Sequence, residues 1–158
     1  EDFAAAPDAI PLGTPSGKVE LEDRRWTVWK RAPAGEDFLL VTPKRMDRVH
    51  SQGGDYAAAV RENRLEMNED DAAALGLADG DAAVVESATG KTKAPVILSG
   101  SITRGVVSLP EGSWFAEPEA DAADVLTAGA ANALTSTEGT EESRSCVMHG
   151  IAVRVRKA

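Results

Sequence analysis

The sequence has little of what builds disulfides, metal clusters or membrane spans. Its single cysteine, Cys146, excludes an intrachain disulfide. One thiolate also cannot supply a cysteine-rich zinc site or an iron–sulfur cluster from these 158 residues alone. We expect Cys146 to be a buried structural thiol. No apolar run approaches the roughly 20 residues that a membrane helix needs, so we expect no direct insertion into a membrane.

Positive charge is also scarce. The formal net charge is -9, which argues against a nucleic-acid partner because such binding normally needs a basic face. Against this background, residues 44–50 gather three cationic side chains, one acid and a histidine. Ser51 and Gln52 follow, and both can donate hydrogen bonds. A local group of cations and donors in an acidic chain indicates a bound anion.

Motifs for independent catalysis are missing as well. The sequence holds no nucleophile motif with a base, no metal-ligand spacing between its two histidines and no glycine-rich phosphate loop. The acidic residues 69–71 follow Asn68, a helix-capping residue type, and are typical of a helix start rather than a metal site. We therefore expect no catalytic or metal-ligating residue here, and an inactive isolated chain.

The spacing of proline, glycine and apolar residues predicts a mainly β fold. Residues 1–35 carry proline and glycine at short intervals and are typical of an extended connecting segment, with a short strand at 18–21. Residues 36–158 are expected to form one domain. Its predicted strands cover 37–42, 64–68, 82–87, 92–99, 105–110 and 150–158.

Helices are expected to be few and short. One is predicted at 55–63, and a second at 68–76 between a capping asparagine and a glycine stop. Residues 111–132 are expected to be mostly loop, with helical character around 119–126. Many short strands, few helices and frequent turns together favour a β barrel.

Several segments together resemble one family in their order and spacing. They are TPSGKVEL (14–21), LLVTPKRMDRVHSQ (39–52), MNEDDAAALGLADGDAAVVESATGK (67–91), GVVSLPEGSWF (105–115) and GAANALTS (129–136). They resemble the C-terminal molybdopterin-dinucleotide-binding domain of the dimethyl sulfoxide reductase family of molybdenum enzymes. The resemblance covers nearly the whole chain. It implies a six-stranded double-psi β-barrel of the aspartate-decarboxylase-like type, with a few short helices.

The resemblance also implies a ligand for the loop at 42–52. In the family, the equivalent segment contacts the pterin and phosphate portions of bis(molybdopterin guanine dinucleotide). Arginine can bind a pyrophosphate through parallel hydrogen bonds, and serine, glutamine and histidine suit a pterin edge. The predicted cofactor-binding residues are Arg48, His50, Ser51 and Gln52, then Thr42, Lys44 and Arg45, and Asn132 from GAANALTS.

A looser match adds two candidates from the segment SRSCVMHG at 143–150. In the family, the corresponding last loop lies near the dinucleotide, so Ser145 and His149 are further candidate contacts. Each candidate also has a simpler structural interpretation. A single basic residue can be a solvated surface charge, His50 can be structural, and Asn132 can be a turn residue.

The resemblance implies that the complete enzyme transfers an oxygen atom or an electron pair at molybdenum, with sulfoxide reduction as the nearest activity. The cofactor would be shared with upstream domains of the same polypeptide, which hold the metal ligand. Further partners implied are an iron–sulfur electron-transfer subunit and a membrane anchor subunit. Because the chain begins at Glu1, we expect a fragment of a longer polypeptide, in the periplasm or the cytoplasm according to a missing signal.

Two alternatives remain open at this point. Double-psi barrels also serve as protein-recognition modules, and the loop at 42–52 would then bind a peptide or a subunit. A free-standing small subunit could instead bind the cofactor with a larger partner chain. RVHSQ and GAANALTS in this order argue against a recognition module, and TPSGKVEL favours one long polypeptide.

Overall fold

The structure is a computed structural model in which two compact units, Glu1–Lys30 and Arg31–Ala158, are distinguished. The boundary that the sequence predicts after residue 35 stays a prediction. The residues that the structure describes are 12–20, 38–46, 49–52, 63–113, 125–126, 129–137, 139 and 144–158.

The described part of the first unit, residues 12–20, consists of turns. The Gly17 amide donates to the Thr14 carbonyl at 2.9 Å, and the Ser16 amide donates to the Glu20 carboxylate at 2.9 Å. The strand predicted at 18–21 is wrong for residues 18–20, because local hydrogen bonds of serine and threonine compete with extended pairing.

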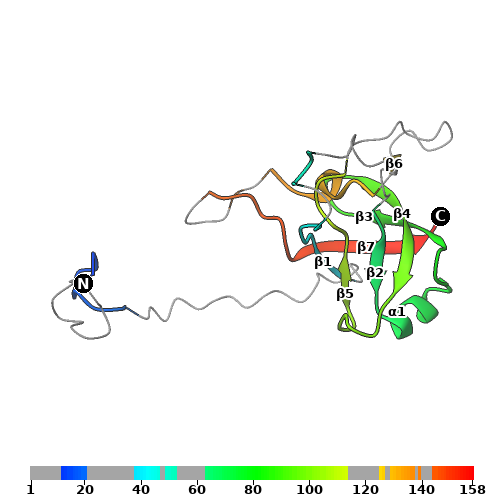
Figure 1. The fold of residues 1–158 in the computed structure, drawn as a ribbon, viewed down its shortest axis with the longest axis horizontal. Helices are drawn as coiled ribbons and strands as arrows, with labels where there is room; N and C mark the ends of the chain where they lie inside the picture. Colours follow the sequence, from blue (N-terminus) through cyan, green and yellow to red (C-terminus); the bar gives the residue numbers. More distant parts are fainter. Residues whose placement is uncertain are drawn as a thin grey trace. The chain divides into compact units, whose positions relative to one another are not determined.

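Strands dominate the second unit. They are β1 (Phe38–Val41), β2 (Leu65–Met67), β3 (Ala82–Glu86), β4 (Lys91–Leu98), β5 (Val106–Ser108), β6 (Val125–Leu126) and β7 (Ile151–Lys157). The order β2-β5-β1-β7-β3-β4 closes on itself because β4 also pairs with β2 (Figure 1). β6 adds to β4 outside this ring. Closure gives each of the six strands of the ring two neighbours, and the predicted β barrel is confirmed.

The alternation of apolar residues explains which face each strand buries. Leu65 and Met67 on β2 are buried, and so are Val153 and Val155 on β7, whereas Arg154 between the two valines is exposed. Side chains of a strand alternate between its two faces, so each apolar set points into the barrel. The predicted strands at 64–68 and 150–158 are confirmed.

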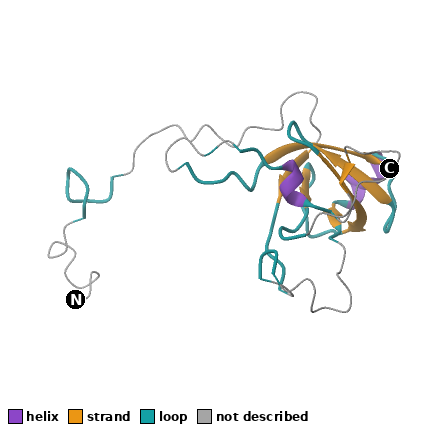
Figure 2. Cartoon of the chain, turned by 90° about the horizontal axis from the view of Figure 1, so that it is seen from above, coloured by secondary structure: helices purple, strands orange, loops and turns teal. Residues whose placement is uncertain are grey.

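Helical segments are short, and Figure 2 shows them beside the strands. Helix α1 (Glu69–Ala74) begins after Asn68, whose side chain accepts a hydrogen bond from the Asp70 amide at 3.0 Å. Gly76, at φ 68, follows the helix as its sequence predicts. None of the helices in the described part of the chain is long and apolar enough to cross a membrane.

Two expectations are wrong, and a third concerns residues that the structure does not describe. The helical character predicted up to residue 126 is wrong at its end, because Val125–Leu126 form β6 beside β4. Cys146, expected to be buried, is exposed. The helix predicted at 55–63 lies outside the described residues, apart from Asn63. A 3₁₀ helix that the sequence did not indicate, η2, covers Ala131–Leu134.

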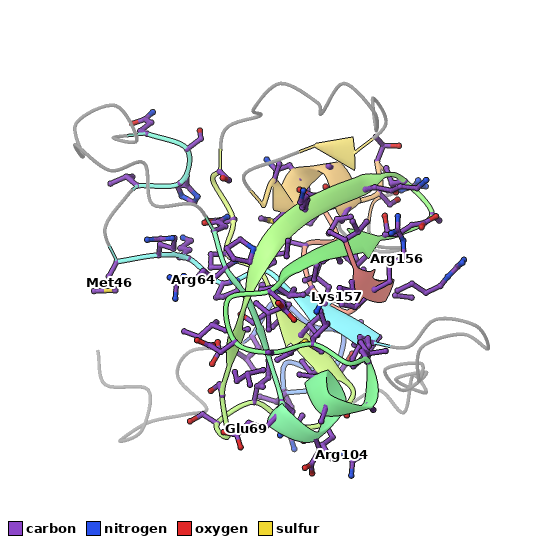
Figure 3. The ribbon with its side chains drawn as sticks, turned by 90° about the vertical axis from the view of Figure 1, so that its right-hand side faces the viewer. Met46, Arg64, Glu69, Arg104, Arg156 and Lys157 are labelled. Atoms are coloured by element: carbon purple, nitrogen blue, oxygen red, sulfur yellow. The ribbon has the colours of Figure 1, made fainter. Side chains whose placement is uncertain are left out.

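The directions of the strands bring several loops to one end of the barrel. β1 and β5 are parallel, so both end at this rim, and β7 begins there because it is antiparallel to β1. β2 and β4 also begin there. Helix α1 and η2 lie at opposite ends of the barrel (Figures 1 and 3). We call this rim the loop end, and it carries residues 42–46, 49–52, 63, 109–113, 129–134 and 144–150.

At the other end of the barrel, Asp81 ties a turn to the last strand. Its carboxylate accepts hydrogen bonds from the Lys157 ammonium at 2.7 Å and from the Ala78 amide at 2.9 Å. The Lys157 hydrogen bond, followed by that of Ala78, lowers the pKa of Asp81 below its usual value. A lowered pKa stabilises the fold above the usual carboxyl value of about 3.9, and this contribution is lost as the pH falls through the folded-state value.

We therefore expect Asp81→Asn to lower the urea midpoint at pH 7 and to weaken the loss of stability on acidification below about pH 4. The measurement is urea unfolding followed by circular dichroism at pH 7 and pH 3. Glu69→Gln, at an exposed position of α1, is the matched control for removing one carboxylate. If Asp81→Asn had the same urea midpoints as the original chain at both pH values, this stabilising role of Asp81 would be excluded.

Candidate functional site

Thr42 joins the end of β1 to the last loop of the chain. Its side chain is buried, and its hydroxyl donates to the Met148 carbonyl at 2.7 Å. Its amide donates to Nδ1 of His149 at 3.0 Å. Nearby, the Gly150 amide donates to the Leu40 carbonyl at 2.9 Å. These bonds fix residues 148–150 against the start of the loop that was predicted to bind an anion.

The segment after β5 packs against the same loop. The Glu111 amide donates to the Pro43 carbonyl at 3.0 Å, and the buried Glu111 carboxylate lies 2.8 Å from Nδ1 of His50. Gly112 has φ 83, and a Cβ built there would overlap the carbonyl oxygen of His50. Only glycine allows this close approach of the two backbones.

His50 itself lies in a tight turn. The Gln52 amide donates to the Val49 carbonyl at 2.9 Å, and His50 between them has φ 53. Positive φ is uncommon outside glycine, although histidine is among the residues enriched there. A residue held in this region costs free energy and persists only where neighbouring contacts fix it. Here Glu111 and Gly112 provide those contacts.

Asn63 is a site residue that the sequence analysis missed. Its side chain is 0% exposed and lies two residues before β2 begins. Its Nδ2 donates to the carbonyl oxygens of Pro110 and Gly129, and its Oδ1 accepts from the Arg45 guanidinium at 3.3 Å. One buried amide therefore links three segments of the loop end. A polar residue just before a strand was the only signal, and the predicted helix at 55–63 concealed it.

Strand β4 positions the segment that contains Asn132. The Gly129 amide donates to the Lys93 carbonyl at 3.0 Å, and the Ala130 amide donates to the buried Thr92 hydroxyl at 2.9 Å. Asn132 follows in η2 with an exposed side chain. No described residue hydrogen-bonds to its side-chain amide, so within that part of the chain the amide is available for a ligand.

The predicted site residues differ in exposure. Thr42 is buried, and Arg45 is half-buried. Arg48 lies outside the described residues. The structure brings the others together at the loop end, where Lys44, His50, Ser51, Gln52 and Asn132 are exposed. Their binding of a cofactor stays a prediction.

Apolar side chains accompany these polar groups. Met46 is 103% exposed and Val49 is 68% exposed, although both are large hydrophobic residues. Figure 3 shows Met46 at the outer edge of the barrel, pointing away from it. Exposed apolar side chains beside hydrogen-bond donors are typical of a surface that is covered by something else.

A hollow of about 920 Å³ lies along the outer surface of β2, β4 and β5. Its size is within the usual range of roughly 300–1,000 Å³ for ligand pockets. Arg45 belongs both to this hollow and to the loop end, so the two are continuous. The hollow is lined by Arg45, Arg64, Glu66, Gly80, Pro95, Ile97, Ser108 and Pro110.

The chemistry of the loop end suits a phosphate-bearing heterocycle better than a bare metal ion. Among the described residues, no group of three or more histidine, cysteine, aspartate or glutamate residues could hold a metal. The loop end instead presents the cationic Lys44 and Arg45, hydroxyl and amide groups, and two imidazoles. These are donors for phosphate oxygens and partners for the edge of a fused ring.

The closed ring of six strands with the parallel pairs β1–β5 and β2–β4 is a double-psi β-barrel, as predicted. The chain belongs to the family described as "Molydopterin dinucleotide binding domain", whose model matches residues 38–152. The predicted family resemblance is therefore confirmed. Membership implies a molybdenum cofactor, and the donors of the loop end fit its phosphate and pterin groups.

Curated relatives point the same way. The chain is 32% identical to a trimethylamine-N-oxide reductase of Haemophilus influenzae over 89% of this chain and 20% of that protein. It is 30% identical to a biotin sulfoxide reductase of Cereibacter sphaeroides over 97% of this chain and 23% of that protein. The chain thus spans about a fifth of the length of the curated relatives it matches.

A solved structure supports the fold alone. Acetylene hydratase from Pelobacter acetylenicus superposes with a TM-score of 0.68 at 19% identity. The match covers 97% of this chain and 25% of that chain. Acetylene hydratase therefore contains a domain of this architecture.

The contact of Gly112 with His50 leads to a stability prediction. We expect Gly112→Ala to lower the free energy of unfolding by more than the roughly 1–3 kcal/mol of a positive φ alone, because its Cβ would overlap the His50 carbonyl. Gly80→Ala is the matched control, since Gly80 has φ 82 and nothing within 4 Å of its Cβ position. The measurement is urea unfolding. Equal losses in the two variants would show that the close approach is not rigid.

A second prediction concerns Asn63. Asn63→Asp keeps the shape but removes both donors, which leaves the buried carbonyls of Pro110 and Gly129 without this partner. We expect a loss of roughly 2 kcal/mol or more, because each unsatisfied buried group costs about 1–3 kcal/mol. Asn132→Asp, at an exposed position, should stay within about 0.5 kcal/mol. Similar unfolding midpoints for both variants would rule out the linking role of Asn63.

Proposed function

We propose that this chain is the cofactor-binding domain of a longer molybdenum oxidoreductase that reduces sulfoxides or N-oxides. In this proposal it holds the pterin and guanine dinucleotide arms of bis(molybdopterin guanine dinucleotide). One observation carries the proposal: hydrogen bonds join residues 42–46 and 49–52 to 109–113 and 144–150 at the loop end, and Asn63 ties 129–134 to the same group. The names of the relatives, which are reductases of trimethylamine N-oxide and biotin sulfoxide, support the substrate class.

Several side chains at or next to the loop end would hold the dinucleotide. Arg45, aligned by Asn63, binds a phosphate oxygen of the dinucleotide, and Arg48 supplies a second guanidinium. Ser51 and Gln52 donate and accept hydrogen bonds at the pterin or at the guanosine. The Asn132 amide contacts the cofactor from η2. Thr42 acts through the last loop, because its hydroxyl already donates to Met148.

When bound, the cofactor supplies oxygen-atom and electron-pair transfer at molybdenum, and the protein supplies binding, orientation and electrostatics. The described residues would therefore position the dinucleotide and exclude water from its hydrogen bonds with the protein. We propose that the metal ligand and any iron–sulfur cluster lie elsewhere in the longer polypeptide. Hydrogen bonds from the loop end to the pterin would act on the metal indirectly, as outer contacts do.

The exposed apolar residues of the loop end support docking of this surface against another domain. Met46 and Val49 expose most of their surface when the chain is considered by itself. Burial of apolar surface stabilises by about 25 cal/mol per Å², so covering these side chains would favour docking. We propose that upstream domains of the same polypeptide cover them and enclose the cofactor between the two bodies.

The test uses the 158-residue chain and guanosine 5′-diphosphate as the probe. We expect saturable binding that shifts the NMR amide signals of residues 49–52. Arg45→Ala should weaken this binding about tenfold, because a hydrogen bond to a charged group contributes about 1.5 kcal/mol or more. Isothermal titration calorimetry gives the affinity, and the amide spectrum reports whether the variant is folded.

Arg156→Ala provides the matched control. Arg156 is an exposed arginine on β7, away from the loop end. Its removal changes the net charge by the same single unit as Arg45→Ala. The affinity should stay within about twofold of the original, since distant exposed charges are screened by salt. Absence of saturable binding to the original chain, or equal losses in both arginine variants, would contradict a dinucleotide site at the loop end.

A further inference from the structure

The two histidines of the chain are held at the loop end through the same ring atom. His50 uses Nδ1 to meet the Glu111 carboxylate at 2.8 Å, and His149 uses Nδ1 to meet the Thr42 amide at 3.0 Å. Both side chains remain substantially exposed. Within the described part of the chain, Nε2 of neither ring has a hydrogen-bond partner, so Nε2 is the nitrogen that a ligand can reach.

The partners of the two rings demand opposite protonation. An ionised carboxylate only accepts hydrogen bonds, so Nδ1 of His50 must carry the proton that it shares with Glu111. In the neutral ring, Nε2 of His50 is then an acceptor. A backbone amide only donates, so Nδ1 of His149 must be unprotonated. Its Nε2 must then carry the proton and act as a donor.

The partners themselves are fixed by the fold. Glu111 is 7% exposed, and its amide is bonded to the Pro43 carbonyl, so the carboxylate has little freedom to leave His50. The backbone of Gly112 lies so close to the His50 carbonyl that a Cβ at Gly112 would overlap it. The Thr42 amide belongs to the residue directly after β1, and its hydroxyl is also bonded to Met148. Neither ring can therefore change its tautomer without losing one of these contacts.

We propose that Glu111 and the Thr42 amide are positioning groups that lock His50 and His149 in opposite tautomers. The pair then offers the cofactor one Nε2 acceptor and one Nε2–H donor. This inference rests on the proposed function, because the ligand is the dinucleotide cofactor. The acceptor at His50 and the donor at His149 can serve different groups of the dinucleotide, because pterin and guanine both carry donors and acceptors on their edges. A phosphate, which only accepts hydrogen bonds, would use His149 alone.

The tautomers can be read without any ligand. In the ¹⁵N-labelled 158-residue chain, the long-range ¹H–¹⁵N spectrum of the neutral rings should show Nδ1–H for His50 and Nε2–H for His149. Neutral imidazole side chains in water favour Nε2–H, so Nδ1–H at His50 is the diagnostic result. Nε2–H in both rings, or two rings in free exchange between tautomers, would overturn the proposal.

Two substitutions of Glu111 separate positioning from packing. Glu111→Ala removes the acceptor, and His50 should change to Nε2–H. Glu111→Gln keeps an oxygen that can accept from Nδ1–H, so His50 should keep its original tautomer. Glu69→Ala, on exposed α1, controls for loss of a carboxylate. If Glu111→Ala did not fold, Nε2–H at His50 in the original chain would still refute the lock.

Binding of guanosine 5′-diphosphate tests the consequence. Glu111→Ala should weaken binding about tenfold, whereas Glu111→Gln should stay within about threefold of the original chain. His149→Gln retains a donor and should bind, while His149→Leu should lose about tenfold. Equal affinities for all four variants would overturn the ligand role. If the original chain showed the two tautomers but bound no nucleotide, the proposed function would fail while the tautomer lock remained.

Discussion

The parallel pairing of β1 with β5 is the constraint on which the loop end depends. In the register of this pair, Leu40 lies beside Val107, and both strands end at the same rim. An antiparallel pair would send residues 42–52 and 109–113 to opposite ends of the barrel. Parallel pairing is slightly weaker per residue and requires a long connection. Closure through β2 and β4 supports it, because each strand of the ring then has two neighbours.

Buried polar groups, rather than loop flexibility, give the loop end its shape. The Asn63 amide bonds to Pro110, Gly129 and Arg45, and the Glu111 carboxylate bonds to His50. In a low-dielectric setting, a satisfied network of this kind is rigid, because breaking any bond leaves a costly unpaired group. Such a network prepares the surface before a ligand arrives, which reduces the entropy lost on binding.

The sequence predicted the local elements well because local patterns determine them. Alternating apolar residues marked β2 and β7, and a capping asparagine with a glycine stop marked α1. The resemblance to a known family supplied the barrel type and the candidate residues of the loop at 42–52. The strand pattern alone could not have supplied the parallel pairs, since a strand pairs with any neighbour that matches its register.

The failures have a common physical cause. Asn63 was hidden by a predicted helix, and its importance comes from carbonyls that lie 47 and 66 residues away in the sequence. Glu111 showed no local motif, because its partner His50 belongs to another loop. Val125–Leu126 became a strand because β4 offered a free position beside it. Long-range partners decide these residues, and no window of sequence contains both members of each pair.

The charge balance of the chain follows from the same arrangement. An acidic protein can hold an anionic ligand only if its cations are concentrated where the ligand lies, because long-range repulsion is screened within about 8–10 Å in salt. Lys44 and Arg45 follow shortly after β1, and Asn63 holds Arg45 beside the segments that follow β5 and β6. The strand directions therefore bring these two cations to one end of the barrel. A net charge of -9 is therefore compatible with the anionic ligand that we propose for the loop end.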